Sequence, residues 1–506
     1  MNLINDVWIP VRRKNGEKIK IAPGQITEAI GTDKEITELA AVRPDFNGAL
    51  IQFLIGLLQT TCAPKGNSDW LEWLNNPPLA DELKSKFAPI AFAFNLDGDG
   101  PRFMQDFDLD NVDRKTKEEI EKLLIDAPGD QTLKQNKDLF IKRNRAEKLC
   151  WCCCAQALLT LQINAPSGGK GHRVGLRGGG PVNTIVLGDG LWQTLWNNVF
   201  LENEFAVLAM LTKTADADKF PWCASPRTSE KDRSTMPQDI HPAQIYWSMP
   251  RRIRLDFVDK QGKCDLCHEF GQLIEAYYTK PYGVKYDGFI HPLTPTYKNK
   301  DGMILPVHQH EALGYKHWLG YVQNTDSGSE PARVISAAFN RRLNNFRLWV
   351  FGYDMDNMKA SCWYEGTMPV IFIENETQWK YYNSEIAMLI RAADRISDYL
   401  SKAVVKALNA GVFNTVRQRF WQETEPEFYR QIASLRDEII QDKDGLDIRQ
   451  KWYEELKKKA EAIFNDMSQA EMIEDINAER VAKAYNELRR NLHGKKLKIE
   501  ILGLPK

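Results

Sequence analysis

The 506-residue sequence has almost no net charge, because 67 Lys and Arg residues oppose 68 Asp and Glu residues. A neutral protein has no overall electrostatic field that would draw it onto nucleic acid. Any contact with a polyanion must therefore be local, through loops whose own charge is out of balance.

The sequence also has no apolar run long enough to span a bilayer, which takes about 20 residues. Its first residues, MNLINDVWIPVRRKNG, do not place an apolar segment behind a basic start as a secretory signal does. We therefore expect a cytoplasmic protein without membrane contact. In that compartment the nine cysteines stay reduced, so clustered cysteines indicate a metal and not disulfides.

Familiar catalytic motifs are missing as well. The zinc-protease pattern H-E-x-x-H, the hydrolase pattern G-x-S-x-G and the phosphate-binding P-loop do not occur. The eight His residues are scattered, and their densest set, His308, His310 and His317, has no metal-ligand pattern. We therefore expect a protein that is not an enzyme. The alternative is a metal-dependent nucleic-acid-processing enzyme that builds its site from scattered carboxylates and His residues.

The texture of the sequence changes near Asn375, which indicates two domains. Residues 1–375 alternate short apolar runs with Gly, Pro, Asn and Asp, which predicts a large, irregular mixed α/β domain. Residues 376–506 place apolar residues at helical spacing, which predicts a C-terminal four-helix bundle and an α+β fold class. Helix breaks are expected near 409–411, 442–445 and 466–468, with N-caps at Asn414 or Thr415 and at Ser468.

Two C-x-x-C pairs stand far apart in the sequence and supply four thiols: Cys150, Cys153, Cys264 and Cys267. A two-residue spacer lets both sulfurs of a pair reach one zinc ion at about 2.3 Å, and four thiolates leave no open position for catalysis. The sequence therefore predicts one structural zinc ion in the N-terminal domain. Two points stay open, because Cys152 and Cys154 make the first pair ambiguous and His268 could replace a cysteine ligand.

Two loop-like tracts flank the first cysteine pair and carry excess positive charge. The tract 131–148 holds six cations against two acids, with Phe140 among the charges. Cations with an interleaved aromatic suit a phosphate backbone and a base face. The glycine-rich tract 165–182 has no acid and three cations, Lys170, Arg173 and Arg177, and glycine lets the backbone approach a phosphate closely. A solvated basic loop and a glycine loop that only packs or turns are the alternatives.

Several stretches together resemble one family. They are NLINDVWIPV at the start, PRFMQ at 101–105, the first cysteine pair followed by VGLRGGGPV, and GYDMDNMKASCWYE at 352–365. In their combination and order they are similar to the CasA family, the large subunit of the type I-E CRISPR surveillance complex Cascade. The resemblance implies a mixed N-terminal domain with the zinc site, followed by a four-helix bundle.

The resemblance also implies a function in antiviral defence. A CasA subunit recognises the protospacer-adjacent motif (PAM) in target double-stranded DNA, helps to open the duplex for R-loop formation and recruits the helicase–nuclease, without catalysis of its own. In RNA-guided systems the protein reads only this short motif, while base pairing reads the rest. The implied partners are the backbone, small and guide-RNA 5′-end-capping subunits, the crRNA, the target duplex and the helicase–nuclease. A purely structural scaffold without DNA contact is the further alternative.

The resemblance places DNA contacts in four elements. A loop before the first cysteine pair matches at Phe140 and Lys142, beside Arg143, with Lys142 where the family has Asn. A minor-groove glycine loop matches Ser167, Gly168, Gly169, Lys170 and Gly171. A lysine that reaches the motif matches Lys280, with Lys285 as the second choice. A wedge hairpin matches Asn357, Met358, Lys359 and Ala360, and a Met there suits insertion between base steps.

Overall fold

The computed structural model describes residues 1–109, 117–135, 145–169, 171–206, 215–310, 314–325, 328–343, 346–356, 359–470 and 477–505. The chain divides into two compact units. The N-terminal unit comprises Met1–Glu311, Pro331–Arg342 and Arg347–Glu365, and the C-terminal unit comprises Ala312–Glu330, Leu343–Phe346 and Gly366–Lys506. Within the described ranges, no helix combines the length and the apolar character needed to cross a membrane.

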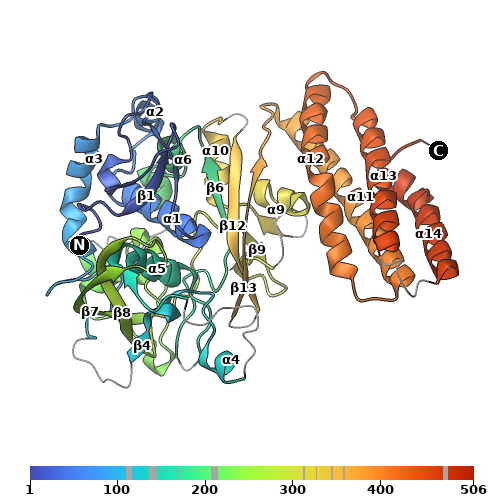
Figure 1. The fold of residues 1–506 in the computed structure, drawn as a ribbon. Coiled ribbons are helices and arrows are strands. Elements are labelled where there is room, and N and C mark those ends of the chain that lie inside the picture. The colour runs from blue at the N-terminus through green and yellow to red at the C-terminus, as the bar shows by residue number, and fades with distance from the viewer. Residues whose placement is uncertain are drawn as a thin grey trace. The chain divides into compact units, whose positions relative to one another are not determined.

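Most helices of the N-terminal unit are short. They are α1 (Pro44–Thr61), α2 (Asn67–Asn75), α3 (Ala80–Phe87), α4 (Asp130–Lys134), α5 (Trp151–Asn164), α6 (Leu191–Asn197), α7 (Glu202–Ala206), α8 (Asp216–Lys219) and α10 (Arg333–Asn340). Small antiparallel sheets lie among them (Figure 1). The mixed α and β content predicted for this part of the chain is therefore confirmed.

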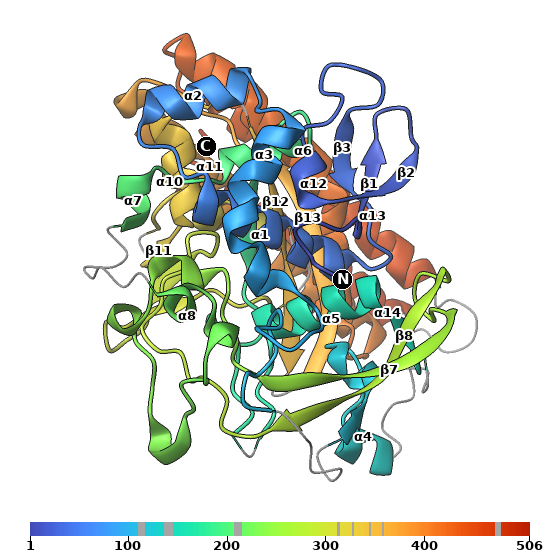
Figure 2. The same cartoon turned by 90° about the vertical axis from the view of Figure 1, so that its left-hand side faces the viewer.

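Three sheets organise the strands of this unit. The first pairs β1 (Ile9–Arg13) with β2 (Lys18–Ile21) and β3 (Ile36–Leu39). In the second, β8 (Phe270–Lys280) pairs along one edge with β7 (Arg252–Lys263) and along the other with β4 (Lys117–Glu119) and β5 (Leu149–Cys150). In the third, β12 (Arg347–Asp356) lies between β6 (Asn183–Leu187) and β13 (Lys359–Pro369). A separate hairpin joins β9 (Thr296–Lys298) to β10 (Ile304–Pro306). Figure 2 shows β7 and β8 as two long strands, which pair antiparallel.

Helix α1 forms the core of the N-terminal unit. Pro44 occupies its first turn, where an amide would have no helical partner, and Asp45 complements the helix dipole there. The apolar run that follows is buried on all sides, and Phe53 makes edge contacts at 5.3 to 6.0 Å between ring centroids with Trp8, Phe94, Phe103 and Trp247. Each such pair adds about 0.5–1.5 kcal/mol to the burial itself. These five aromatic residues therefore form a cluster in the core around α1.

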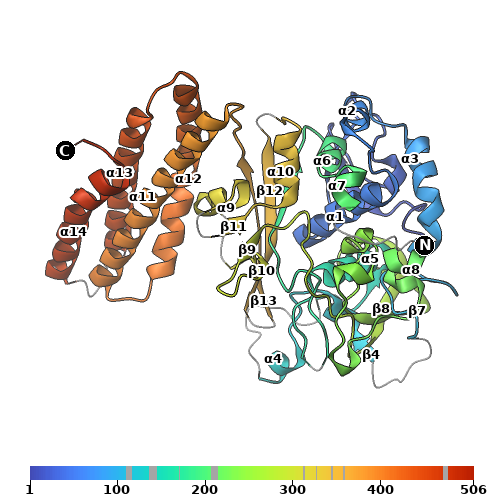
Figure 3. The same cartoon turned by 180° about the vertical axis from the view of Figure 1, so that it is seen from behind.

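The C-terminal unit is built on long helices. They are α11 (Glu376–Leu408), α12 (Phe413–Ile440), α13 (Leu446–Ala470) and α14 (Ala478–Leu492), and the unit also contains the short α9 (Trp318–Val322) and β11 (Ser329–Glu330). Helix α11 packs against the other three long helices (Figures 1 and 3). Buried Glu385 accepts hydrogen bonds from Arg449 at 2.6 Å, and this pair ties α11 to α13. Tyr315 stacks on Phe428 with ring centroids 4.2 Å apart.

Two of the predicted helix breaks are confirmed. Helix α11 ends at Leu408, and its C-cap is Asn409, whose φ of 57° is a left-handed conformation that Asn adopts more readily than most residues. The break between α12 and α13 contains Asp442, with a φ of 58°, and Gly445, with a φ of 66°. Local residue chemistry accounts for both ends.

The third break and the predicted caps are wrong. Helix α13 continues to Ala470, and the Ser468 hydroxyl donates to the Asn465 carbonyl at 3.1 Å within the helix. Asn414 and Thr415 lie inside α12. The cap of α14 is Asn477, whose side chain accepts from the Arg480 amide at 3.0 Å.

Candidate metal centre and nucleic-acid interface

The first cysteine pair lies where a strand turns directly into a helix. Cys150 ends β5, where it pairs with Leu273 of β8, and it is also the N-cap of α5. Its sulfur accepts a hydrogen bond from the Cys153 amide at 3.5 Å. One turn of helix therefore brings the two sulfurs to the same side.

The second pair lies in the turn between β7 and β8. The Cys264 amide donates to the Glu269 carbonyl at 2.9 Å, and the His268 amide donates to the Cys264 carbonyl at 3.0 Å. Two hydrogen bonds between Asp265 and Lys148 fasten this turn to the segment before Cys150: Asp265 N to Lys148 O at 3.1 Å, and Lys148 N to Asp265 Oδ2 at 2.9 Å. The pairing of β5 with β8 and this fastening bring the two pairs together.

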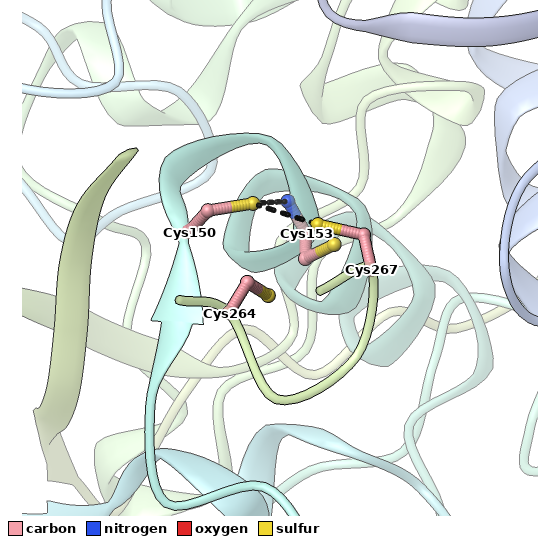
Figure 4. A group of neighbouring side chains, drawn as sticks. All are labelled: Cys150, Cys153, Cys264 and Cys267. Carbon is pink, nitrogen blue, oxygen red and sulfur yellow. Dashed lines mark hydrogen bonds between the residues drawn. The ribbon is translucent and has the colours of Figure 1, made fainter. Parts of the chain in front are cut away.

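The four sulfurs form one cluster (Figure 4). They lie within 4.8 Å of one another, and the sulfurs of Cys150 and Cys267 are 3.6 Å apart. Thiolates at the corners of a zinc tetrahedron lie about 3.8 Å apart, given zinc–sulfur bonds of about 2.3 Å. The side chain of His268 is exposed and lies outside the cluster, and the cluster does not include Cys152 or Cys154. The structure thus brings together the predicted set and resolves its ambiguity.

Hydrogen bonding among the sulfurs shifts the pKa values of the cluster thiols in opposite directions. Contacts with Cys150 lower the pKa of Cys264 well below its usual range and raise the pKa of Cys153. Hydrogen bonding to Cys152 raises the pKa of Cys150 to about 11. A divalent ion would displace the remaining protons, because the thiolate is the metal-binding form. Four sulfur donors of this spacing fit a closed zinc site.

The glycine loop 167–171 follows the other end of α5. The Gly168 amide donates to the His172 carbonyl at 3.2 Å, and the His172 amide donates to the Gly169 carbonyl at 2.8 Å. Gly171 has a φ of 83° and its carbonyl accepts from the Tyr282 amide at 2.9 Å. A Cβ on Gly171 would lie 2.8 Å from that amide nitrogen, so this close approach needs glycine. Of the predicted contact residues here, Lys170 lies outside the described residues.

Lys280 ends β8, two residues before Tyr282, and its side chain is exposed. The bond from Tyr282 to Gly171 places the glycine loop beside the segment that follows Lys280. The second choice, Lys285, forms an ion pair with Asp232 at 3.0 Å.

The other predicted contacts are placed only in part. Strands β12 and β13 are neighbours in their sheet, and Lys359 and Ala360 begin β13 with the Lys359 side chain exposed. The wedge residues Asn357 and Met358 lie between these strands in sequence, outside the described residues. The loop residues Phe140, Lys142 and Arg143 lie outside them too.

One expectation about the glycine-rich tract is wrong. Arg177 does not offer its donors to a ligand, because it is only 4% exposed. Its guanidinium donates to Gln52 Oε1 at 2.7 Å, to Thr294 Oγ1 at 3.0 Å and to Asn183. The second half of the tract is a packing element of the core, which was the alternative interpretation.

Sequence reasoning missed Arg251, which lies immediately before β7. Its Nη2 donates to the Pro166 carbonyl at the base of the glycine loop. No sequence signal indicated this contact, because Arg251 stands between Pro250 and Arg252 in no recognisable motif. Only the pairing of distant segments shows it.

Comparisons with known proteins give one family. The family model described as CRISPR-associated protein Cse1 matches residues 2–463. Cse1 from Thermobifida fusca is 14% identical, with a TM-score of 0.73 over 100% of this chain and 99% of its own. CasA from Thermus thermophilus is 17% identical, with a TM-score of 0.71 over 97% and 99% of the two chains. A chain of a solved CRISPR RNA-guided surveillance complex is 15% identical, with a TM-score of 0.68 over 98% and 99%. These solved structures share the fold.

Proposed function

The chain belongs to the CRISPR-associated protein Cse1 family, and from that premise we propose that it is the non-catalytic large subunit of a type I-E Cascade complex. In this role it recognises the PAM in target double-stranded DNA, assists R-loop formation and recruits the helicase–nuclease. The glycine loop 167–171, Lys280 and residues 357–360 contact the duplex, together with Phe140, Lys142 and Arg143. Cys150, Cys153, Cys264 and Cys267 hold one structural zinc ion.

The observation that best supports this proposal is the course of α5 and β8. Both begin near the cysteine cluster, and the segments that follow them meet at the glycine loop. Helix α5 has 14 residues, and so spans about 21 Å at 1.5 Å per residue. Strand β8 runs from Leu273, the partner of Cys150, to Lys280, about 26 Å at 3.3 Å per residue. Both paths span more than about 20 Å, and the bond from Tyr282 to Gly171 joins the segments that follow them. A zinc ion in the cluster would therefore fix the glycine loop and Lys280 together.

The experiment is a gel-shift series with the guide-RNA complex and a library of motif-bearing duplexes. Replacing Lys280 or Lys359 by Ala should weaken binding of the preferred duplex about tenfold, as expected for a charge-assisted contact. Lys260→Ala is the matched control, because Lys260 is an exposed lysine of β7 that already pairs with Glu275 at 2.6 Å. If duplex binding is unchanged in both Lys280→Ala and Lys359→Ala, direct reading of the motif by these lysines is contradicted and the scaffold alternative is favoured.

The non-catalytic part has its own test. The purified chain alone, incubated with duplex or single-stranded DNA and a divalent metal, should yield no cleavage product. A metal-dependent product from this chain would favour the enzyme alternative. Recruitment is tested separately, by capture of the helicase–nuclease on DNA-bound complexes that contain or lack this subunit.

A further inference from the structure

Arg251 is hydrogen-bonded to the last turn of α5. Its amide donates to Gln162 Oε1 at 3.0 Å, and Gln162 Nε2 donates back to the Arg251 carbonyl at 3.0 Å. Gln162 is fully buried. The backbone of Arg251 is therefore fixed to the same helix that begins at the cysteine cluster.

The side chain of Arg251 lies directly against the glycine loop. Its Nη2 donates to the Pro166 carbonyl, and a Cβ on Gly168 would lie 2.6 Å from its Nη1. No side chain other than hydrogen fits between Gly168 and the guanidinium without a shift. The loop backbone is thus in contact with a cation.

This cation has no counter-charge among the residues that the structure describes. Burial lowers the pKa of Arg251 to about 10, so the guanidinium remains charged at neutral pH, and its buried Nε has no hydrogen-bond partner in the described part of the chain. The adjacent Arg252 differs, because it pairs with Asp106 at 2.6 Å. A largely buried charge without a partner is costly, and the cost is relieved if a ligand supplies the anion.

The surface beside Arg251 is open and suits an anion. A Cβ on Gly169 would meet nothing within 4 Å, and in the described part of the chain no carbonyl accepts from the Gly169 amide. Lys280, at the end of β8, is exposed and has no ion-pair partner among the described residues. Glu118 influences the neighbouring His172, but it is itself paired with Lys122 at 2.6 Å.

We propose that Arg251 and the Gly169 amide form a binding site for one phosphate of the DNA backbone, which supplies the missing counter-charge to Arg251. This inference rests on the proposed function, and it assigns the glycine loop a sequence-independent contact. A guanidinium and backbone amides are the donors that phosphate oxygens favour. The loop would then set the register of the duplex, while other elements read its bases.

The test measures affinity of the assembled guide-RNA complex for the preferred duplex over a range of salt concentrations. Each neutralised phosphate contributes about 0.9 to the slope of log affinity against log salt concentration. Arg251→Gln should lower that slope by about one and weaken binding about tenfold, equally for preferred and poor motifs. Arg251→Lys keeps the charge and should keep the slope.

The matched control is Arg12→Gln, which removes the same charge from an exposed ion pair with Glu38 elsewhere in the N-terminal unit. It should leave slope and affinity unchanged. An unchanged slope in Arg251→Gln, in protein that retains its metal content and melting temperature, would overturn the phosphate site. If Arg251→Gln does not fold, an unchanged affinity in Arg251→Lys overturns it instead, because an ammonium group does not reproduce the donor geometry of a guanidinium at a phosphate. Failure of the wild-type complex to discriminate motifs at all would count against the proposed function itself.

Discussion

The Tyr353 hydroxyl donates a hydrogen bond of 2.5 Å to Oδ2 of Asp45 in the buried interior of the N-terminal unit. Asp45 also accepts two bonds of 3.0 Å from Arg43, which reaches Asp126 at 2.9 Å. Burial raises the pKa of Tyr353 well above its usual value, so the phenol stays a donor. Strand β12, which leads to the proposed wedge, is thereby fastened to the first turn of α1.

Tyr353→Phe removes the donor and leaves Asp45 with Arg43 as its partner. We expect a loss of about 1–2 kcal/mol in the free energy of unfolding, the usual contribution of a hydrogen bond to a charged group. Scanning calorimetry should show a lower melting temperature for the N-terminal unit. Tyr297→Phe is the control, because Tyr297 lies on a strand of the same unit and is 37% exposed. Equal melting temperatures for the two variants would contradict a stabilising role for the bond.

Metal content tests the cysteine cluster. Protein purified without added metal should contain about one equivalent of zinc by elemental analysis, as a closed four-ligand site retains its ion. Cys264→Ser should lose most of that zinc and melt at a lower temperature. Cys152→Ser, which alters a cysteine between the two members of the first pair, should retain it. If Cys264→Ser retains all of its zinc, the assignment of the four cysteines as zinc ligands is wrong.

Gly171→Ala probes the glycine loop through its backbone. The new methyl group would meet the Tyr282 amide nitrogen at 2.8 Å in a left-handed conformation, so the bond that joins the loop to the Lys280 segment should break. We expect duplex affinity of the complex to fall at least as far as in Lys280→Ala, with zinc content unchanged. Gly16→Ala, with a φ of 88° and no neighbour within 4 Å, controls for backbone strain alone. The prediction fails if the two alanine variants bind alike.

His241 should make the stability of the N-terminal unit depend on pH. Its Nδ1 accepts from the Ala243 amide at 3.0 Å, and burial lowers the pKa of His241 from 6.5 to about 4. Between these two pKa values the unfolded chain binds a proton at His241 more readily than the folded protein does. The free energy of unfolding therefore falls as pH decreases from about 6.5 towards 4. His241→Asn keeps an acceptor that does not titrate, so its melting temperature should fall less steeply over that window. Parallel curves would exclude His241 as the cause.

Much of the cysteine cluster could be predicted from sequence, because a C-x-x-C spacing determines the local geometry of its two sulfurs independently of the rest of the fold. The chain has two C-x-x-C pairs, so each pair had one evident partner for a four-cysteine site. Helix ends marked by local chemistry were also predictable, as Asn409 illustrates with its left-handed conformation. Mixed α/β content followed from the short apolar runs.

Features that depend on distant residues could not be predicted. Arg177 lies in a glycine-rich tract that indicates an exposed loop, yet its partner Gln52 is 125 positions away in α1. Ser468 has the chemistry of a cap, but it is itself buried, and α13 continues past it to Ala470. Tertiary contacts overrode local preference in both cases.

The separation of the two cysteine pairs has a consequence for biosynthesis. Cys150 and Cys267 are 117 positions apart, so at roughly 5–20 residues per second the ribosome takes roughly 6–23 s to travel from one to the other. Through that interval the nascent chain presents two thiols without their partners. The four-cysteine cluster therefore cannot form until the β7–β8 turn has emerged, at a stage when the C-terminal helices are still to be made.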